Sequence, residues 1–232
     1  YEEMSDKYRY EIKFVLNETA LSRFLSWLYT STNCREKYPE RIVNSIYFDD
    51  VSYSSVKDNL AGIPNRMKTR LRWYQNEKER QIGIPILESK IKDGRLGTKS
   101  SIPINSLENA IFSSTFSTMI NNIKEEVPRD HFAALEYLIP TLHVSYSRQY
   151  YESNNGLRIT IDDNIKFDSH LSLHDILSGE GKVSYRSKIV ELKFDPSMKN
   201  YVSDLIRPLS LTPVRNSKYL TGLAMFGQVY YL

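Results

Sequence analysis

The sequence lacks most of the motifs by which an enzyme is recognised at first reading. Its 232 residues include one cysteine, Cys34, which excludes an internal disulfide and any site built from several thiolates. Neither the GxxxxGK loop nor the GxGxxG loop occurs, so the usual glycine-rich nucleotide motifs are excluded. Because no run of about 18 apolar residues and no charged leader with an apolar stretch is present, neither a transmembrane helix nor a signal peptide is predicted.

The charge balance also excludes a simple interpretation. The 31 Lys and Arg residues against 28 Asp and Glu residues give a net charge of +3, which is too small to indicate a polyanion partner by composition. Tyrosine is frequent, at 17 residues, and this favours strands. The length predicts one domain spanning residues 1–232. The single cysteine fits a reducing compartment, so we expect a cytoplasmic protein, with any membrane tether supplied by a partner or a missing segment.

Alternation of polar and apolar residues predicts a largely antiparallel β structure. The expected strands cover residues 7–16, 41–50, 65–75, 86–94, 141–153, 157–163 and 188–195, with a return segment through Lys99. Helical spacing and capping residues predict helices at 17–29 and 51–61, two or three within 105–138, about ten residues from Pro196, and one from Ser217. This mixture predicts an α+β fold.

The polar faces of these strands are unusually rich in cations. They carry Arg9, Lys13, Arg66, Lys68, Arg70, Arg72, Lys90, Lys92, Arg148, Arg158 and Lys193, against Glu11, Glu88, Asp162, Glu191 and Asp195. For any one strand, a solvated polar face is the ordinary interpretation. Like charges opposite one another destabilise a sheet, however, so we expect the sheet to close into a barrel with helices outside and a lumen that binds a polyanion.

The same faces suggest phosphate chemistry that depends on a metal. Arginine forks bind phosphate oxygens in pairs, and Tyr74 and Tyr146 add hydroxyl groups. Glu191 is the best candidate ligand for Mg²⁺ or Mn²⁺, together with Glu11 or Glu88, although ion pairing is an equally good interpretation of the last two. No catalytic triad is legible. The histidines, which we expect at the surface or at helix ends, are His131, His143, His170 and His174.

Several blocks in order resemble a known family. They are RYEIKFVL, SIYFDD, KTRLRWY, LESKIKDGRLGTKS, HVSYSRQYY, LRITIDD, VELKFD and RNSKYLTG. The chain resembles the vacuolar transporter chaperone (VTC) domain, the polyphosphate polymerase branch of the triphosphate tunnel metalloenzymes, which are related to the CYTH proteins. The resemblance implies a closed antiparallel eight-stranded β-barrel, with ATP as donor, Mn²⁺ or Mg²⁺, and polyphosphate or triphosphate in the tunnel.

The strand faces and the resemblance together predict a set of site residues, of which Lys68, Lys193 and Glu11 come from the strand faces alone. The catalytic cations would be Lys13, Arg70, Arg72, Lys90, Arg148, Arg158 and Lys218, further phosphate ligands Lys68, Lys99, Tyr146, Lys193, Arg215 and Ser217, and metal ligands Glu191 and Glu11. Lys99, Arg215, Ser217 and Lys218 follow from the resemblance alone. The chain departs from the pattern at Arg9, where CYTH relatives have the first Glu of Glu-x-Glu-x-Lys, and at Arg215, where Lys is usual.

Three functions fit these expectations. The first is a polyphosphate polymerase that transfers the γ-phosphate of ATP, with hydrolysis of triphosphate or short polyphosphate as a close alternative. The second class is a polyphosphate-binding subunit without catalysis. A third is single-stranded nucleic-acid binding by a basic, tyrosine-rich surface, which we do not expect. A membrane-protein partner is compatible with the family but is not visible in this chain.

Overall fold

The computed structural model describes residues 9–76, 82–93, 96–111, 114–129, 135–169 and 182–230, with the backbone alone at 91–93 and 96–98. The strands are β1 (Tyr10–Leu16), β2 (Arg35–Asp49), β3 (Arg66–Gln75), β4 (Ile86–Asp93), β5 (Leu96–Pro103), β6 (Ile139–Glu152), β7 (Arg158–Asp168), β8 (Val183–Ser184) and β9 (Lys188–Phe194). The helices are α1 (Glu18–Ser31), α2 (Ser54–Leu60), α3 (Phe116–Glu126), α5 (Lys199–Ile206) and α6 (Lys218–Met225), with 3-10 turns η1 (Asn105–Leu107), η3 (Pro196–Met198) and η4 (Arg207–Leu209).

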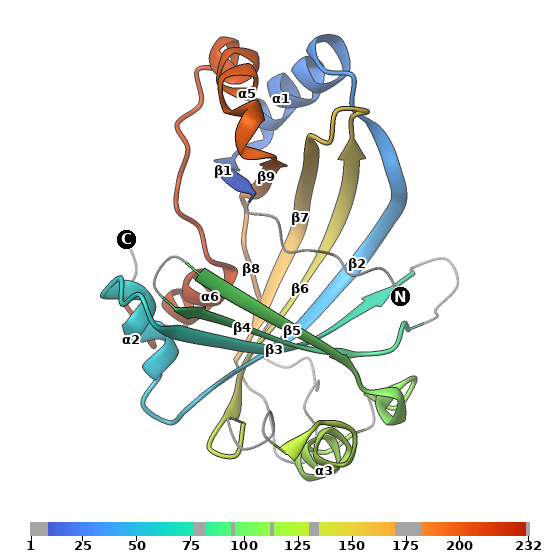
Figure 1. Ribbon diagram of the computed structural model, residues 1–232, viewed down its shortest axis with the longest axis vertical. Coiled ribbons are helices and arrows are strands. Elements are labelled where there is room, and N and C mark those ends of the chain that lie inside the picture. The colour runs from blue at the N-terminus through green and yellow to red at the C-terminus, as the bar shows by residue number, and fades with distance from the viewer. Residues whose placement is uncertain are drawn as a thin grey trace. The chain divides into compact units, whose positions relative to one another are not determined.

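The strands form one large antiparallel sheet, which confirms the predicted α+β class (Figure 1). Its order is β1-β9-β7-β6-β2-β3-β4-β5, and the short β8 pairs with β7. The predicted closed barrel is not found, because β1 and β5 stand at the two ends of this order and no strand pair of the described residues joins them. Alternation in the sequence identified the polar faces, but it carries no information about which strand edges pair.

The chain divides into two compact units. Unit 1 comprises residues 1–41, 146–165 and 185–216, and unit 2 comprises residues 42–145, 166–184 and 217–232. Strands β2, β6 and β7 each begin in one unit and end in the other. Each unit has its own hydrophobic core.

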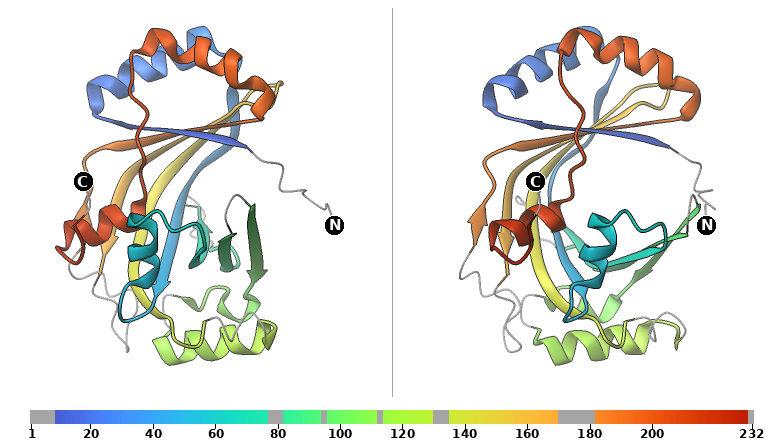
Figure 2. Two further views of the ribbon diagram at one scale, coloured as in Figure 1. Left: turned by 60° about the vertical axis from the view of Figure 1, so that its left-hand side comes forward. Right: turned by 90° about the vertical axis from the view of Figure 1, so that its left-hand side faces the viewer.

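The core of unit 1 lies between its strands and two helices. Helix α1 begins after Asn17, whose side chain accepts a hydrogen bond from the Ala20 backbone N–H at 2.9 Å, as its capping sequence predicts. Helices α1 and α5 cover the same face of β1 and β9 (Figure 2). The Trp27 indole donates to the Leu205 carbonyl at 2.9 Å and so ties α1 to the α5 region. The apolar faces of these strands therefore pack against helices, as expected.

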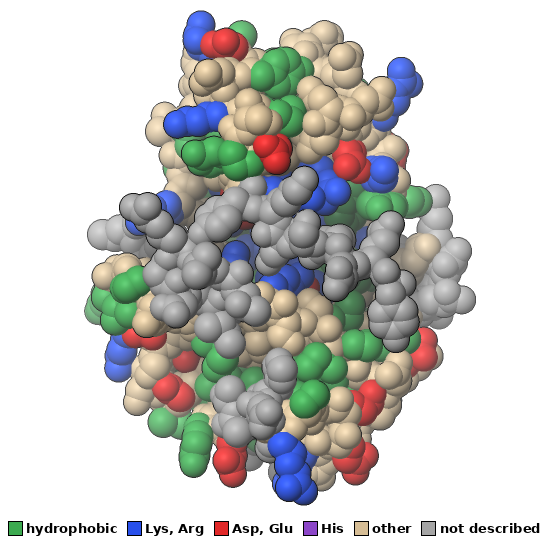
Figure 3. Space-filling model, viewed as in Figure 1, with side chains coloured by type: hydrophobic (Ala, Val, Ile, Leu, Met, Phe, Trp, Pro, Cys, Tyr) green, Lys and Arg blue, Asp and Glu red, His purple; other side chains and the backbone are tan. Residues whose placement is uncertain are grey.

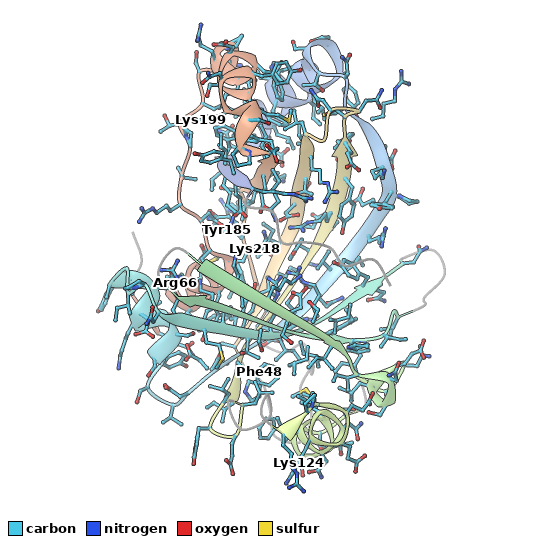
Figure 4. The ribbon with its side chains drawn as sticks, in the orientation of Figure 1. Phe48, Arg66, Lys124, Tyr185, Lys199 and Lys218 are labelled. Carbon is cyan, nitrogen blue, oxygen red and sulfur yellow. The ribbon has the colours of Figure 1, made fainter. Side chains whose placement is uncertain are left out.

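Unit 2 packs its strands against α3. Leu71 and Trp73 of β3 are fully buried together with Met119 and Ile123 of α3. Figure 4 labels Phe48 on the α3 side of β3 and β4, and Lys218 at the start of α6 on the other side. The outer surface around α3 interleaves Lys and Arg with Asp and Glu, the ordinary pattern of a solvated surface (Figure 3).

Helix α6 packs closely against β6 and β7 in unit 2. A Cβ atom at Gly222 would come within 2.6 Å of the side chains of Leu142 and Phe167. A side chain at this position would displace these neighbours, so glycine lets α6 lie close to the sheet.

The prediction for His143 was wrong. Instead of lying at the surface, His143 is buried on β6, stacks on Trp73, and forms a 3.1 Å hydrogen bond with the Asn44 side chain. Burial, with a contribution from Lys182, lowers its pKa to about 3, so the imidazole is neutral. The other histidines, His131, His170 and His174, lie outside the described residues.

The predicted strands and helices of the described residues are confirmed with shifted ends. Strand β2 begins six residues early, at Arg35 instead of residue 41, and β7 runs on to Asp168. The Asn154-Asn155-Gly156 turn joins β6 to β7, and Gly156 has the positive φ of 88° that favours glycine. None of the described helices has the length and apolarity required to cross a membrane.

Candidate functional site

Unit 2 presents a cationic face on β3. Arg70 and Arg72 alternate with Leu71 and Trp73, whose side chains fill the core, so both guanidinium groups lie on the opposite face of the sheet. Lys68 occupies the same face two residues earlier. The alternation of hydrophobic and basic residues that the sequence predicts here is therefore present in the structure.

A single carboxylate, Glu88 on β4, binds several of these cations. Arg70 approaches Glu88 Oε2 with Nε and Nη2, both at 2.6 Å, while Lys99 Nζ lies 3.0 Å from Oε1 and Arg72 Nη1 lies 3.8 Å from Oε2. Burial raises the pKa of Glu88, but Arg70, Arg72 and Lys99 outweigh it and lower the pKa to about 2. Of the two roles predicted for Glu88, metal binding and ion pairing, this arrangement shows ion pairing.

The register of β3, β4 and β5 aligns lysines across the sheet. Lys68 is opposite Lys90, and Lys90 is opposite Lys99. Like charges directly opposite one another destabilise a sheet by up to roughly 1 kcal/mol per pair. This lysine row, Lys68–Lys90–Lys99, is therefore an arrangement that a bound anion would stabilise.

Tyr47 on β2 joins this face, and the sequence analysis missed it. Its register partner on β3 is Arg70, whose Nη1 donates to the Tyr47 hydroxyl at 3.3 Å. Burial raises the pKa of Tyr47, but Arg70, Arg72 and Lys218 lower it to about 8. The signal was present in SIYFDD, where Tyr47 alternates with the buried Ile46 and Phe48.

A buried hydrogen-bond network fixes the start of α6 beside this face. The Tyr219 ring stacks on Tyr47 at a centroid distance of 5.0 Å, and its hydroxyl donates to Asp49 Oδ2 at 2.9 Å. Thr141 is 3.0 Å from the same hydroxyl. Lys218, which precedes Tyr219, is thereby held close enough to lower the pKa of Tyr47. Ser217 immediately precedes this helix.

Unit 1 presents a second cationic face, centred on Arg148 of β6. Arg148 makes a two-pronged ion pair with the fully buried Asp162 of β7, with Nε–Oδ1 at 2.5 Å and Nη2–Oδ2 at 2.7 Å. Its guanidinium carbon lies 5.1 Å from the centroid of the Tyr146 ring. Burial would lower the pKa of Arg148, but Tyr146, Asp162 and Glu191 raise it well above its usual value. Arg148 is therefore a fixed, permanently charged group.

The two predicted metal ligands lie together in unit 1, and both are paired with lysines. Lys13 Nζ is 2.7 Å from Glu11 and 3.8 Å from Glu191. Lys193 Nζ is 2.6 Å from Glu191 and 3.7 Å from Glu11. These contacts follow from the register of β1 and β9, in which Glu11 is opposite Lys193 and Lys13 is opposite Glu191. The result is a compact cluster of two carboxylates and two ammonium groups.

The remaining predicted residues of unit 1 lie at the margins of this face. Arg158 is opposite Lys193 in the register of β7 and β9, but its side chain is half exposed and pairs with Glu152 at 3.1 Å. Arg215 is exposed on a segment held along β1, where Val214 N–H donates to the Lys13 carbonyl and Lys13 Nζ donates to the Asn216 carbonyl. The structure thus brings Arg215 near Lys13.

Glu11 and Glu191 could bind a hard divalent cation only if other ligands completed its coordination. The part of the chain that the structure describes contains no group of three or more His, Cys, Asp or Glu side chains suited to a metal. Mg²⁺ and Mn²⁺ are commonly held by one or two carboxylates with substrate phosphates as further ligands. The pair would fit such a shared site, with phosphate oxygens of a ligand supplying the other donors.

Unit 1 thus holds Lys13, Tyr146, Arg148, Arg158, Lys193, Arg215, Glu11 and Glu191, and unit 2 holds Lys68, Arg70, Arg72, Lys90, Lys99, Ser217 and Lys218.

A comparison with protein-family models identifies the family of the chain. A model of the VTC domain matches residues 8–227. The chain belongs to the VTC-domain family.

Solved structures share the fold of this VTC domain across 95% of its length. A candidate adenylyl cyclase from Hippeastrum with a dominant triphosphatase activity is 14% identical, with a TM-score of 0.57 over 96% of that chain. A candidate adenylate cyclase from Vibrio parahaemolyticus is 13% identical, with a TM-score of 0.52 over 99% of that chain. A Pyrococcus horikoshii OT3 protein is 14% identical, with a TM-score of 0.51 over 99% of that chain.

At these identities the likeness shows the fold alone. A comparison with curated protein sequences gave no match.

Proposed function

We propose that this VTC domain is a polyphosphate polymerase, which transfers the γ-phosphate of ATP to a phosphate or polyphosphate acceptor. The observation that carries the proposal is the lysine row of unit 2 beside Arg70 and Arg72, where several cations share the carboxylate of Glu88. Such a face suits a ligand with many negative charges along its length. Membership of the family supports polyphosphate or triphosphate as that ligand.

The transfer needs positioning and charge stabilisation more than a protein nucleophile. An oxygen of the acceptor phosphate attacks the γ-phosphorus, the bond from that phosphorus to the β–γ bridging oxygen breaks, and ADP leaves with the electron pair. Arg70, Arg72 and the lysine row would bind the equatorial and bridging oxygens as charge develops on them. Residues 1–232 act as one domain in this proposal.

The metal would be held by Glu191 and Glu11. A bound Mn²⁺ or Mg²⁺ supplies charge neutralisation at the phosphate oxygens. The chain's own residues prepare for it, because Lys13 and Lys193 hold both carboxylates in place. When phosphates arrive, these ammonium groups can bind phosphate oxygens while the carboxylates bind the metal.

Incubation of the purified chain with ATP and Mn²⁺ tests the proposal. We expect long phosphate chains on a gel together with one ADP for each phosphate transferred. Free phosphate with ADP instead would identify hydrolysis, the alternative that the Hippeastrum relative's triphosphatase activity favours. Absence of both products would exclude both enzymatic functions and leave a phosphate-binding subunit.

Replacement of Glu191 by Gln separates catalysis from binding. We expect turnover to fall roughly 100-fold or more, because a metal ligand is lost, while polyphosphate binding is retained. Glu36→Gln, an exposed carboxylate at the start of β2, is the matched control and should leave turnover within about twofold. Equal turnover in both variants would contradict the assignment of Glu191 to the metal.

A further inference from the structure

A row of aromatic rings and guanidinium groups continues outward from Arg148 in unit 1. The Arg148 guanidinium carbon lies 6.0 Å from the centroid of the Tyr150 ring. The Arg41 guanidinium carbon lies 5.5 Å from the same ring and 4.8 Å from the Tyr38 ring. Tyr38 and Tyr150 meet at a centroid distance of 5.7 Å with their planes at 86°. Arg148, Tyr150, Arg41 and Tyr38 therefore form one continuous row of contacts.

The row lies on the cationic face of unit 1. Tyr150 follows Arg148 by two residues on β6 and so shares its side of the strand. Tyr151, the next residue on β6, belongs to the buried core on the other side. Because Tyr38 contacts Tyr150 directly, the beginning of β2 contributes to the same face.

Exposure and chemistry both change along the row. Tyr146, at the inner end beside Arg148, is 3% exposed, whereas Tyr38 at the outer end is 46% exposed. Phosphate oxygens require hydrogen-bond donors and positive charge, which the Arg148 end supplies. The face of a tyrosine ring carries negative electrostatic potential and repels an anion, but it stacks well on a flat heterocycle. The outer end is therefore suited to a ring and the inner end to phosphate.

Contacts within the row also orient the side chain at its outer end, Tyr38, before a ligand binds. Arg41 lies against the Tyr38 ring, and Tyr150 is set nearly perpendicular to it, so that the Tyr38 side chain is oriented although nearly half of it is exposed. A side chain that is already oriented loses less entropy on binding. Guanidinium planes add a second stacking surface beside the ring.

We propose that Tyr38, Arg41 and Tyr150 bind the base of the nucleotide donor, next to the phosphate-binding Arg148. The inference rests on the proposed function, because it names the part of the site that distinguishes a nucleotide from a phosphate chain without a base. Stacking is tolerant of base identity, so ATP and GTP should bind with similar affinity. Tripolyphosphate has no base and gains nothing from these residues.

The test compares the dissociation constants of the full chain for ATP and for tripolyphosphate, measured by calorimetry. Tyr38→Leu should weaken ATP binding about tenfold and leave tripolyphosphate binding within about twofold of the unsubstituted chain. Tyr38→Trp, which keeps a stacking ring, should retain ATP binding. The matched control is Tyr201→Leu on α5, a tyrosine of similar exposure, 47%, which should change neither constant.

The outcomes separate the base site from the proposed function. If the unsubstituted chain binds both ligands and Tyr38→Leu weakens both equally or neither, the base site is wrong while phosphate binding stands. If Tyr38→Trp behaves like Tyr38→Leu, stacking is not the interaction and the base site is likewise overturned. If the unsubstituted chain binds neither ligand, both proposals fail.

Discussion

The two cationic faces carry carboxylates in different proportion to their cations. In unit 1, Arg148 pairs with Asp162, and Lys13 and Lys193 share two carboxylates. The described ion pairs of the unit 2 face instead converge on Glu88, which serves Arg70, Arg72 and Lys99. Among the residues named above, unit 2 thus has more cations than carboxylates, with Lys68, Arg70, Arg72, Lys90, Lys99 and Lys218 beside Glu88. Unit 1 is closer to balance, with Lys13, Arg148, Arg158, Lys193 and Arg215 beside Glu11, Glu152, Asp162 and Glu191.

This difference indicates two tasks for similar residues. A surplus of cations suits the binding of a phosphate chain, because like-charge repulsion in the unliganded protein is relieved when the anion binds. A balanced set of carboxylates and ammonium groups suits a metal that binds together with its phosphates, because carboxylate and phosphate oxygens are ligands that Mg²⁺ and Mn²⁺ prefer. Variants that remove charge from one face at a time test this difference.

The largest expected effect is on the buried pair of unit 1. Asp162→Asn would leave the Arg148 guanidinium without a carboxylate in a largely buried position, and breaking such a pair lowers the free energy of unfolding by about 3–5 kcal/mol. The control is Glu152→Gln, which breaks the more exposed pairs with Arg158 and Lys37 and should lower it by at most about 1 kcal/mol for each pair. Urea unfolding of both variants measures the difference. Equal losses would mean that the Arg148–Asp162 pair is not a structural anchor.

The next effect concerns Glu88 and depends on pH. The folded-state pKa of Glu88, about 2, is below its ordinary value of 4.5, so its ionised form stabilises the folded protein. That contribution, about 3 kcal/mol, is complete above pH 4.5 and is lost as the pH falls through 2. Glu88→Gln should therefore be less stable than the unsubstituted protein at pH 7, with the gap closing toward pH 2. A gap that is independent of pH would contradict the ion-pair role of Glu88.

Much of each face could be predicted from the sequence, because alternation decides which side of a strand a residue occupies. It placed Arg70 and Arg72 opposite Leu71, and Glu191 opposite Val190 and Leu192, as the structure has them. It failed where both sides of a strand are covered. Leu142, His143 and Val144 are consecutive and all buried, so alternation gave no warning that His143 is internal.

Contacts between strands distant in sequence could not be predicted in the same way. The lysine row requires the register of β3, β4 and β5, and the meeting of Tyr38 with Tyr150 requires β2 and β6 to be neighbours. Strand β2 begins in an exposed, polar stretch that includes Pro39, where no alternation marks a strand. Such pairings depend on the whole fold, and local pattern does not encode them.

A smaller effect should distinguish the lysines of the two faces. Lys90 stands between Lys68 and Lys99, whereas Lys193 already contacts Glu191 at 2.6 Å. Without metal, Lys90→Gln should weaken tripolyphosphate binding about tenfold and raise the free energy of unfolding by up to roughly 1 kcal/mol. Lys193→Gln should weaken binding less, and Lys124→Gln on α3 should not change it. If Lys193→Gln weakened binding more than Lys90→Gln, the surplus of charge in unit 2 would not govern binding.

The smallest effect is spectroscopic, and it reports on the electrostatic potential that the cations of the unit 2 face create. Since Arg70, Arg72 and Lys218 lower the pKa of Tyr47 to about 8, one tyrosine should ionise near that pH, and absorbance at the phenolate wavelength should reveal it. Tyr47→Phe should remove this step and no other. In the folded protein the phenolate is favoured, so stability relative to Tyr47→Phe should rise from pH 8 to the ordinary tyrosine pKa near 10. Tripolyphosphate at saturation should move the step to higher pH, because bound phosphates offset the cations that favour the phenolate; a step that stays near pH 8 would mean that the ligand does not occupy the face beside Tyr47.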